Sequence, residues 1–200
     1  MIFNRCFAIV ICFAGLPLFG GSAPGIKNFD QVDAHVYRGG QPTDAGFHYL
    51  ATLGVKTVID LREPGARSQA EERVVTSSGM KYLNVPMTGL TAPTEAETAK
   101  ILGILEDATG GPVFVHCQRG ADRTGAVIAA YHIDHDQWDN RRALQDAKDH
   151  SMSSLQFPRQ AYIRAFRARP VDAKIDAKTA APIETATSDC APVVAAGLTN

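Results

Sequence analysis

Short apolar runs alternate with amphipathic stretches through the middle of the chain. The clearest run covers residues 55–61 and is rich in β-branched side chains, which is typical of a buried strand. A second run at 113–115 and weaker ones at 32–38 and 80–85 complete the predicted strands. Between and after them, the pattern predicts helices over residues 43–53, 68–78, 94–108, 124–136, 139–150 and 158–169.

Residues with strong capping preferences bound several of these elements. Thr43 or Asp44 can cap the first helix and Gly54 can end it, while Thr94 and Glu97 have the spacing of a capping box. The alternation of strands and helices predicts an α/β fold, with a mainly parallel central sheet flanked by helices in three layers. We expect residues 26–169 to form this single domain, which is large enough for a real core.

The two ends of the chain have a different character. Residues 1–25 have a minimal basic start at Arg5, an apolar stretch over 6–19 and small residues at 20–23, which predicts a signal peptide and export. An uncleaved N-terminal membrane anchor is the alternative, although the apolar stretch is short for a full span. Residues 170–200 are rich in Ala, Pro and Thr without apolar periodicity, and this predicts a disordered tail.

The overall charge excludes some classes of partner. The 200 residues have a formal net charge of −1, which gives no electrostatic case for binding nucleic acid or an anionic membrane surface. Membrane contact is therefore predicted only through an uncleaved N-terminal segment. Any anion must therefore bind at a local site. If the chain has a site for a phosphoryl group, the expected partner is a phosphorylated protein or a small phosphorylated molecule.

A candidate for that site follows the strand at 113–115. Five residues separate Cys117 from Arg123, namely Gln118, Arg119, Gly120, Ala121 and Asp122. A loop of this length can curl around one tetrahedral oxyanion, with backbone N–H groups pointing inward and the positive end of the next helix behind them. Such a field favours a thiolate at Cys117, and Arg123 can offer a planar fork to two oxygens. Gly120 permits the positive φ that a tight turn often needs.

This stretch resembles the HCxxGxxR[ST] signature of the cysteine-based protein phosphatases. The chain matches it at every fixed position: His116, Cys117, Gly120, Arg123 and Thr124. Residues 37–42 and 53–62 also look like the opening of compact dual-specificity and tyrosine phosphatases, closest to the atypical plant-and-fungal group and its bacterial relatives. The similarity covers most of residues 30–169, but only the central loop is highly specific.

The resemblance implies a phosphocysteine mechanism that needs no metal or other cofactor. Cys117 would attack phosphorus in line, while Arg123 and the amides of the loop would hold the phosphoryl oxygens. Thr124 would hydrogen-bond the sulfur and help it leave in the second step. His116 would orient the loop rather than act as a base, because a thiolate needs none.

The chain departs from its relatives at the general acid. Many of them carry an Asp near the position of Gly89, where this chain has no carboxylate. Asp122 is one replacement, since myotubularin-like phosphatases also carry Asp there, and Glu95 is another. Asp122 could instead form an ion pair with Arg119 or Arg62. A third possibility is a substrate whose leaving group has a low pKa and needs little protonation.

The sequence thus predicts an exported cysteine-dependent phosphatase that hydrolyses phosphomonoesters with phosphotyrosine or dual specificity. Arg62 and Arg119 could extend a positive pocket, although solvated loop arginines are also common. The alternatives are a phosphatase of inositol phosphates, pyrophosphates or phosphoinositides, a non-catalytic phosphate-binding relative, and a rhodanese-like sulfur carrier. After export, Cys190 could form a disulfide with Cys117 or remain a free thiol in the tail.

Overall fold

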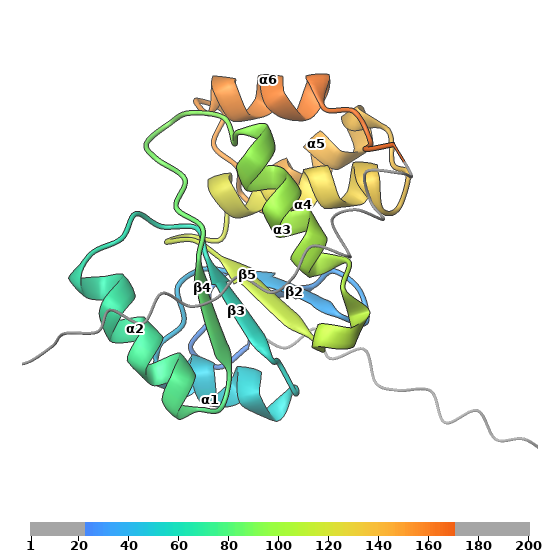
Figure 1. Cartoon of the computed structure of the whole chain (residues 1–200). Coiled ribbons are helices and arrows are strands. Elements are labelled where there is room, and N and C mark those ends of the chain that lie inside the picture. The colour runs from blue at the N-terminus through green and yellow to red at the C-terminus, as the bar shows by residue number, and fades with distance from the viewer. Residues whose placement is uncertain (1–22, 171–200) are drawn as a thin grey trace, which may run out of the picture.

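The computed structural model describes residues 23–170, which form three layers with a five-stranded sheet in the middle and helices on both of its faces (Figure 1). The strand order is β1-β2-β5-β3-β4, and every neighbouring pair is parallel except β1 and β2. The strands are β1 (Asp30–Gln31), β2 (Val36–Gly39), β3 (Thr57–Asp60), β4 (Lys81–Asn84) and β5 (Val113–His116). The helices are α1 (Asp44–Thr52), α2 (Ala66–Ser77), α3 (Glu95–Leu105), α4 (Asp122–Asp134), α5 (Asn140–Asp149) and α6 (Phe157–Ala165), with a 3₁₀ helix at Ala108–Gly110. The predicted fold class is confirmed.

The two faces of the sheet carry separate apolar cores, because successive side chains of a strand point to opposite faces. On β3, Val58 packs in the core that also holds residues of α1 and α2, while Ile59 packs in the core formed with α3 and α4. On β5, Phe114 lies in the first core and Val115 in the second. A third apolar cluster joins α5 and α6 to the outer side of α4.

The element boundaries differ from the predictions in a few places. The strand predicted over 32–38 is shortened to β2, because the Asp33 carboxylate accepts the backbone N–H groups of His35 and Val36 and turns the chain there. The final helix ends at Ala165, since Phe166 takes an extended conformation with ψ of 142°. The helix after the central loop begins at Asp122, two residues earlier than expected.

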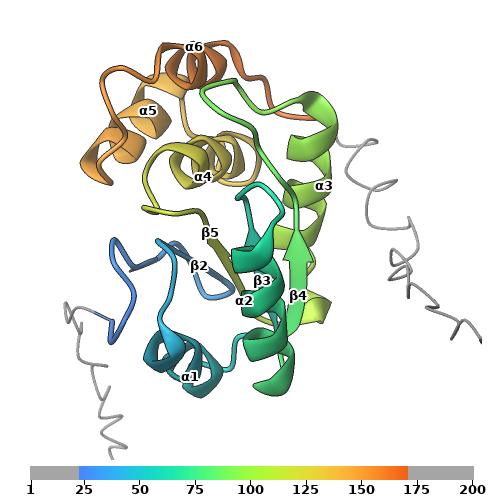
Figure 2. The same cartoon turned by 90° about the vertical axis from the view of Figure 1, so that its left-hand side faces the viewer.

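The parallel topology brings three loops to one edge of the sheet. β3, β4 and β5 all end at this edge, below the layer of α4, α5 and α6 (Figure 2). Ligand sites of such folds lie beyond the carboxyl ends of the strands. Within residues 23–170, no helix is both long and apolar enough to cross a lipid bilayer. Nearly all of the predicted signal segment, the predicted tail and Cys190 lie outside the described residues.

Candidate active site

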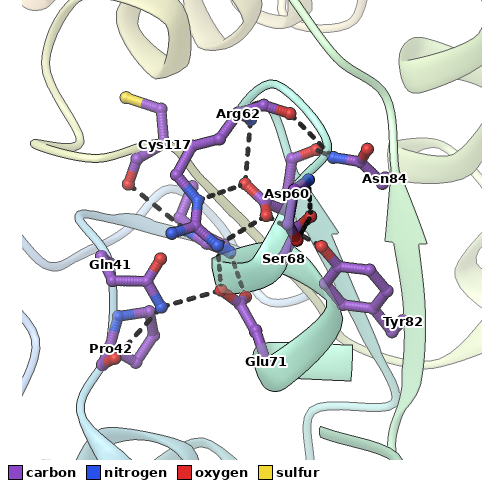
Figure 3. A network of polar contacts seen from close by, with 11 residues as sticks. Gln41, Pro42, Asp60, Arg62, Ser68, Glu71, Tyr82, Asn84 and Cys117 are labelled. Carbon is purple, nitrogen blue, oxygen red and sulfur yellow. Dashed lines mark hydrogen bonds and ion pairs between the residues drawn. The ribbon is translucent and has the colours of Figure 1, made fainter. Parts of the chain in front are cut away.

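The loop between β5 and α4 holds the candidate nucleophile. Cys117 follows the last residue of β5 and is 3% exposed, and its sulfur points away from the polar groups beneath the loop (Figure 3). Gln118 and Arg119 form the exposed top of the loop, and Ala121 is the buried N-cap residue of α4. The first turn of α4 therefore starts beside the thiol, with N–H groups that have no partner inside the helix.

The surroundings of Cys117 favour its ionised form. Burial by itself raises the pKa of this thiol, but the Thr124 hydroxyl and the backbone N–H groups of Thr124, Arg119 and Gly120 more than offset it. The net result is a pKa below the ordinary value of a cysteine. The Thr124 hydroxyl is buried and has no hydrogen-bond partner among the nitrogen and oxygen atoms of residues 23–170, so the sulfur is the group that it can stabilise. The thiolate is the nucleophilic form of cysteine.

Close backbone packing shapes the back of the loop. Gly120 has a φ of +71°, and a Cβ atom there would lie 2.3 Å from the carbonyl carbon of Gly39. Gly40 likewise lies against the backbone of Arg119. The Gly120 carbonyl accepts hydrogen bonds from the side chains of Asn28 at 3.0 Å and Arg38 at 3.3 Å. No larger residue fits at position 120 without moving β2 or the loop.

A buried polar network supports the loop from below (Figure 3). His116 Nε2 lies 2.7 Å from Glu71 Oε1, and the other Glu71 oxygen accepts hydrogen bonds from Gln41 and Arg62. Arg62 also donates two side-chain hydrogen bonds to Asp60, at 2.9 and 2.7 Å. Burial lowers the pKa of His116, but the hydrogen bond and the negative charge of Glu71 more than offset this effect. The net pKa is therefore above that of a free histidine. A protonated His116 balances the network, because two cations then face two carboxylates.

This network ties α2 and three neighbouring strands together. The Tyr82 hydroxyl of β4 donates to Asp60 at 2.8 Å, and the Asn84 amide donates to the backbone carbonyls of Asp60 and Arg62, each at 2.9 Å. Asp60, Glu71 and His116 also have the donor atoms of a metal site, within 4.8 Å of one another. Arg62 pairs with both carboxylates, so each of them already has a cationic partner.

The predicted anion-binding arginines have three different environments. Arg123 has no ion-pair partner within residues 23–170, and its Nε is buried without a hydrogen bond, so its guanidinium can serve an anion. Arg119 is 62% exposed and pairs with Asp122. Arg62 belongs to the supporting network, and both carboxylates in contact with it lie beneath the loop. Of the two pairings considered for Asp122, the structure contains the one with Arg119.

Comparisons with known proteins agree with this geometry. A protein family described as "DSP-PTPase phosphatase fused to NAD+ Kinase" matches residues 22–165. The chain belongs to this family. The matched range includes the loop between β5 and α4, the supporting network and all of α6, so every group described above lies within the match.

Three curated relatives match part of the chain. The chain is 27% identical over 119 residues to the probable NAD kinase 2, chloroplastic, of Oryza sativa, which covers 58% of this chain and 12% of that protein. It is 29% identical over 105 residues to inositol diphosphatase DSP5 of Arabidopsis thaliana, with 50% and 51% of the two chains covered. It is 30% identical over 120 residues to dual specificity protein phosphatase TpbA of Pseudomonas aeruginosa, with 60% and 52% covered. The chain thus spans about half or less of each relative.

The crystal structure of TpbA has a similar fold. It superposes with a TM-score of 0.61 at 25% identity and covers 78% of this chain and 98% of that one. The likeness extends well beyond the signature loop, because 78% of the chain includes more than β5, the loop and α4.

The loop between β4 and α3, where an acid was expected from the resemblance, is held by two residues that the sequence pattern did not single out. The backbone N–H of Gly89 donates to Glu63 Oε1 at 3.2 Å, and its carbonyl accepts from Arg159 Nη2 at 2.8 Å. Asp122 Oδ1 accepts the backbone N–H of Ser153 at 2.9 Å, which joins the start of α4 to the segment before α6. Glu95 lies exposed in the first turn of α3.

Proposed function

We propose that this protein is a cysteine-dependent phosphatase with Cys117 as its nucleophile. The observation that carries the proposal is a thiol of lowered pKa in a loop whose N–H groups point to the sulfur, followed by an Arg123 that has no ion-pair partner within residues 23–170. A non-catalytic phosphate-binding protein would need the loop but not an activated thiol. A sulfur carrier would not need the guanidinium fork at Arg123.

The proposed reaction has two displacement steps. The Cys117 thiolate attacks phosphorus, a P–S bond forms, and the P–O bond to the leaving group breaks with its electron pair on oxygen. Arg123 and the loop N–H groups hold the phosphoryl oxygens during this step. Water then attacks the phosphocysteine, the P–S bond breaks, and inorganic phosphate leaves. Thr124 stabilises the thiolate that departs.

We propose phosphotyrosine or dual-specificity phosphoprotein substrates first. The support comes from the similarity to TpbA, a dual specificity protein phosphatase, and from three exposed apolar side chains at the edges of the site. Leu90 follows Gly89, and Leu155 and Phe157 lie on either side of Gln156. The Arg159 side chain donates hydrogen bonds to the Gly89 carbonyl and to the Gln156 side chain, which brings the two segments together. An aromatic ring or an apolar peptide side chain can bury apolar surface against such side chains, whereas a fully phosphorylated cyclitol has little apolar surface to bury.

A diphosphorylated inositol is the second candidate, favoured by two observations. Gly89 offers no carboxylate, and a phosphoanhydride leaving group needs little protonation. A groove of about 1040 Å³ beside the loop is lined by Arg119 and Lys27, two cations that additional phosphate groups can contact. The similarity to inositol diphosphatase DSP5 supports the same substrate class.

Turnover of the full chain against matched substrates tests this proposal. The panel contains a phosphotyrosine peptide, its phosphoserine counterpart and a diphosphoinositol polyphosphate. We expect the phosphotyrosine peptide to give the highest kcat/KM, and Cys117→Ser to abolish turnover of all three. Preference for the diphosphoinositol substrate would favour the second candidate. Phosphate release that persists in Cys117→Ser would contradict the mechanism for either.

A further inference from the structure

Within residues 23–170, Arg159 is a buried cation without a carboxylate partner. It lies on α6 and is 1% exposed. Its Nη1 donates to the side-chain oxygen of Gln156, its Nη2 donates to the Gly89 carbonyl at 2.8 Å, and its Nε has no hydrogen-bond partner in residues 23–170. Both acceptors are neutral.

Other buried arginines of the described chain are neutralised. Arg38 pairs with Asp146 at 3.2 Å, and Arg62 pairs with Asp60 and Glu71. The half-buried Arg169 likewise pairs with Asp134 and Glu106. A buried charge is costly unless an opposite charge offsets it, because two neutral oxygens replace only part of its hydration. The counter-charge of Arg159 must therefore come from something other than a contacting carboxylate.

The position of Arg159 identifies that counter-charge. Its bond to Gly89 places it against the loop after β4, and the Ser153–Asp122 bond places the segment before α6 against the phosphate loop. Burial and the neighbouring Arg123 lower the pKa of Arg159, while Asp122 and Cys117 raise it. Arg159 thus shares its electrostatic environment with the nucleophile and the phosphate-binding arginine. Asp122 is already paired with Arg119.

We propose that Arg159 is a second cation of the phosphate site, whose counter-charge is the doubly ionised phosphoryl group. This inference rests on the proposed function and deepens it. Arg159 is a positioning residue in this role: it holds the Gly89 loop over the site and favours the phosphoryl dianion through its charge. The loop after β4 is thus held by a cation, and this cation also stabilises a leaving group that departs as an anion.

Binding of inorganic phosphate to the full chain measures this role without turnover. We expect Arg159→Gln to weaken phosphate binding about tenfold near pH 8, where the dianion predominates, and less near pH 5.5, where the anion carries one charge. Arg159→Lys keeps the charge but loses the fork, so it should retain most of the affinity while its melting temperature falls. Arg164→Gln, an exposed arginine on the same helix, is the matched control and should change neither.

A second readout is the pH dependence of Cys117 alkylation by iodoacetamide, followed on the Cys117 peptide by mass spectrometry. We expect Arg159→Gln to raise the pKa of Cys117 and Arg159→Lys to leave it unchanged. The inference is overturned if the Gln and Lys variants bind phosphate equally well at both pH values, or if only the melting temperature moves. Should Arg159→Gln fail to fold, a tenfold loss of phosphate affinity in Arg159→Lys would overturn it. Absence of phosphate binding in the unsubstituted protein would instead contradict the proposed function itself.

Discussion

The reactivity of Cys117 depends on a balance between burial and hydrogen bonding. Burial disfavours a charged sulfur, and only the N–H groups and the hydroxyl directed at it reverse that effect. Cys117 is the one cysteine within residues 23–170, so the described chain offers it no disulfide partner. The thiolate that the loop stabilises is also the form of cysteine that is most readily oxidised. The features that favour a thiolate at Cys117 are thus expected to make it sensitive to peroxide as well.

Asp122 has two possible roles that leaving-group chemistry can separate. If Asp122 protonates the leaving group, Asp122→Asn should slow an alkyl phosphate far more than an activated aryl phosphate, by about 10²–10⁴-fold. If it only braces Arg119 and Ser153, both substrates should lose similar, modest activity and the melting temperature should fall. The measurement is kcat/KM for the two substrates in each variant.

Two further carboxylates serve as parallel controls for Asp122. Glu63→Gln tests the carboxylate that bonds Gly89, and Glu95→Gln tests the one in the first turn of α3. Equal loss on alkyl and aryl substrates in all three variants would reject every candidate acid. That result would favour a leaving group that departs as an anion, as the position of Arg159 also does.

At the scale of elements, the polar network couples α2 to the sheet through charges that depend on pH. The folded-state pKa of His116 is raised, so its ion pair with Glu71 contributes stability below the unfolded pKa of about 6.5 and loses it as pH rises through the folded value. The two elements are therefore joined most firmly at mildly acidic pH. The ion pairs of Arg62 with Asp60 and Glu71 do not depend on the protonation of His116, so they hold α2 to the sheet at higher pH as well.

Glu71→Gln should expose this dependence. Removing one member of a buried ion pair costs about 3–5 kcal/mol, and we expect the variant's loss of stability to be largest near pH 5.5 and smaller near pH 8.5. Urea unfolding at the two pH values gives the free energies, and Glu72→Gln on the exposed side of α2 is the control. A loss that does not change with pH would mean that His116 is neutral in the folded protein.

Elements and site residues differ in how far the sequence predicts them. β3, β5 and the loop after β5 could be predicted, because their signals lie within a few consecutive residues. The turn at Asp33 was missed because a side-chain hydrogen bond overrides strand propensity there. Arg159 and Gly89 could not be paired, since 70 residues separate them and no periodic pattern connects them. The role of Glu71 in the network could not be predicted either, because in the sequence it resembles any polar residue of an amphipathic helix.

At the scale of the whole molecule, contacts at the start of the domain limit where cleavage of the N-terminal segment would leave the fold intact. Ala23 and Ile26 are buried in the core with α1, and Ile26 donates its N–H to the Ala23 carbonyl at 3.2 Å. The Gly25 carbonyl accepts the N–H of Thr43, and the Lys27 carbonyl accepts that of Gly40, which packs on the phosphate loop. Processing after Ala23 would remove a buried residue, whereas processing before it would leave all these contacts intact.

We propose that the protein is exported and processed within residues 20–24, and these contacts favour a mature chain that begins at Ser22 or Ala23. Cell fractionation followed by N-terminal sequencing tests this. We expect the mature protein outside the cytoplasm, with the same melting temperature as a recombinant chain starting at Ala23. A chain starting at Gly25 is the matched control and should melt lower, because burying an Ala methyl contributes about 0.8 kcal/mol and its backbone bond is also lost. Full-length protein in the membrane fraction would support the anchor instead, and full-length protein in the cytoplasm would contradict export in either form.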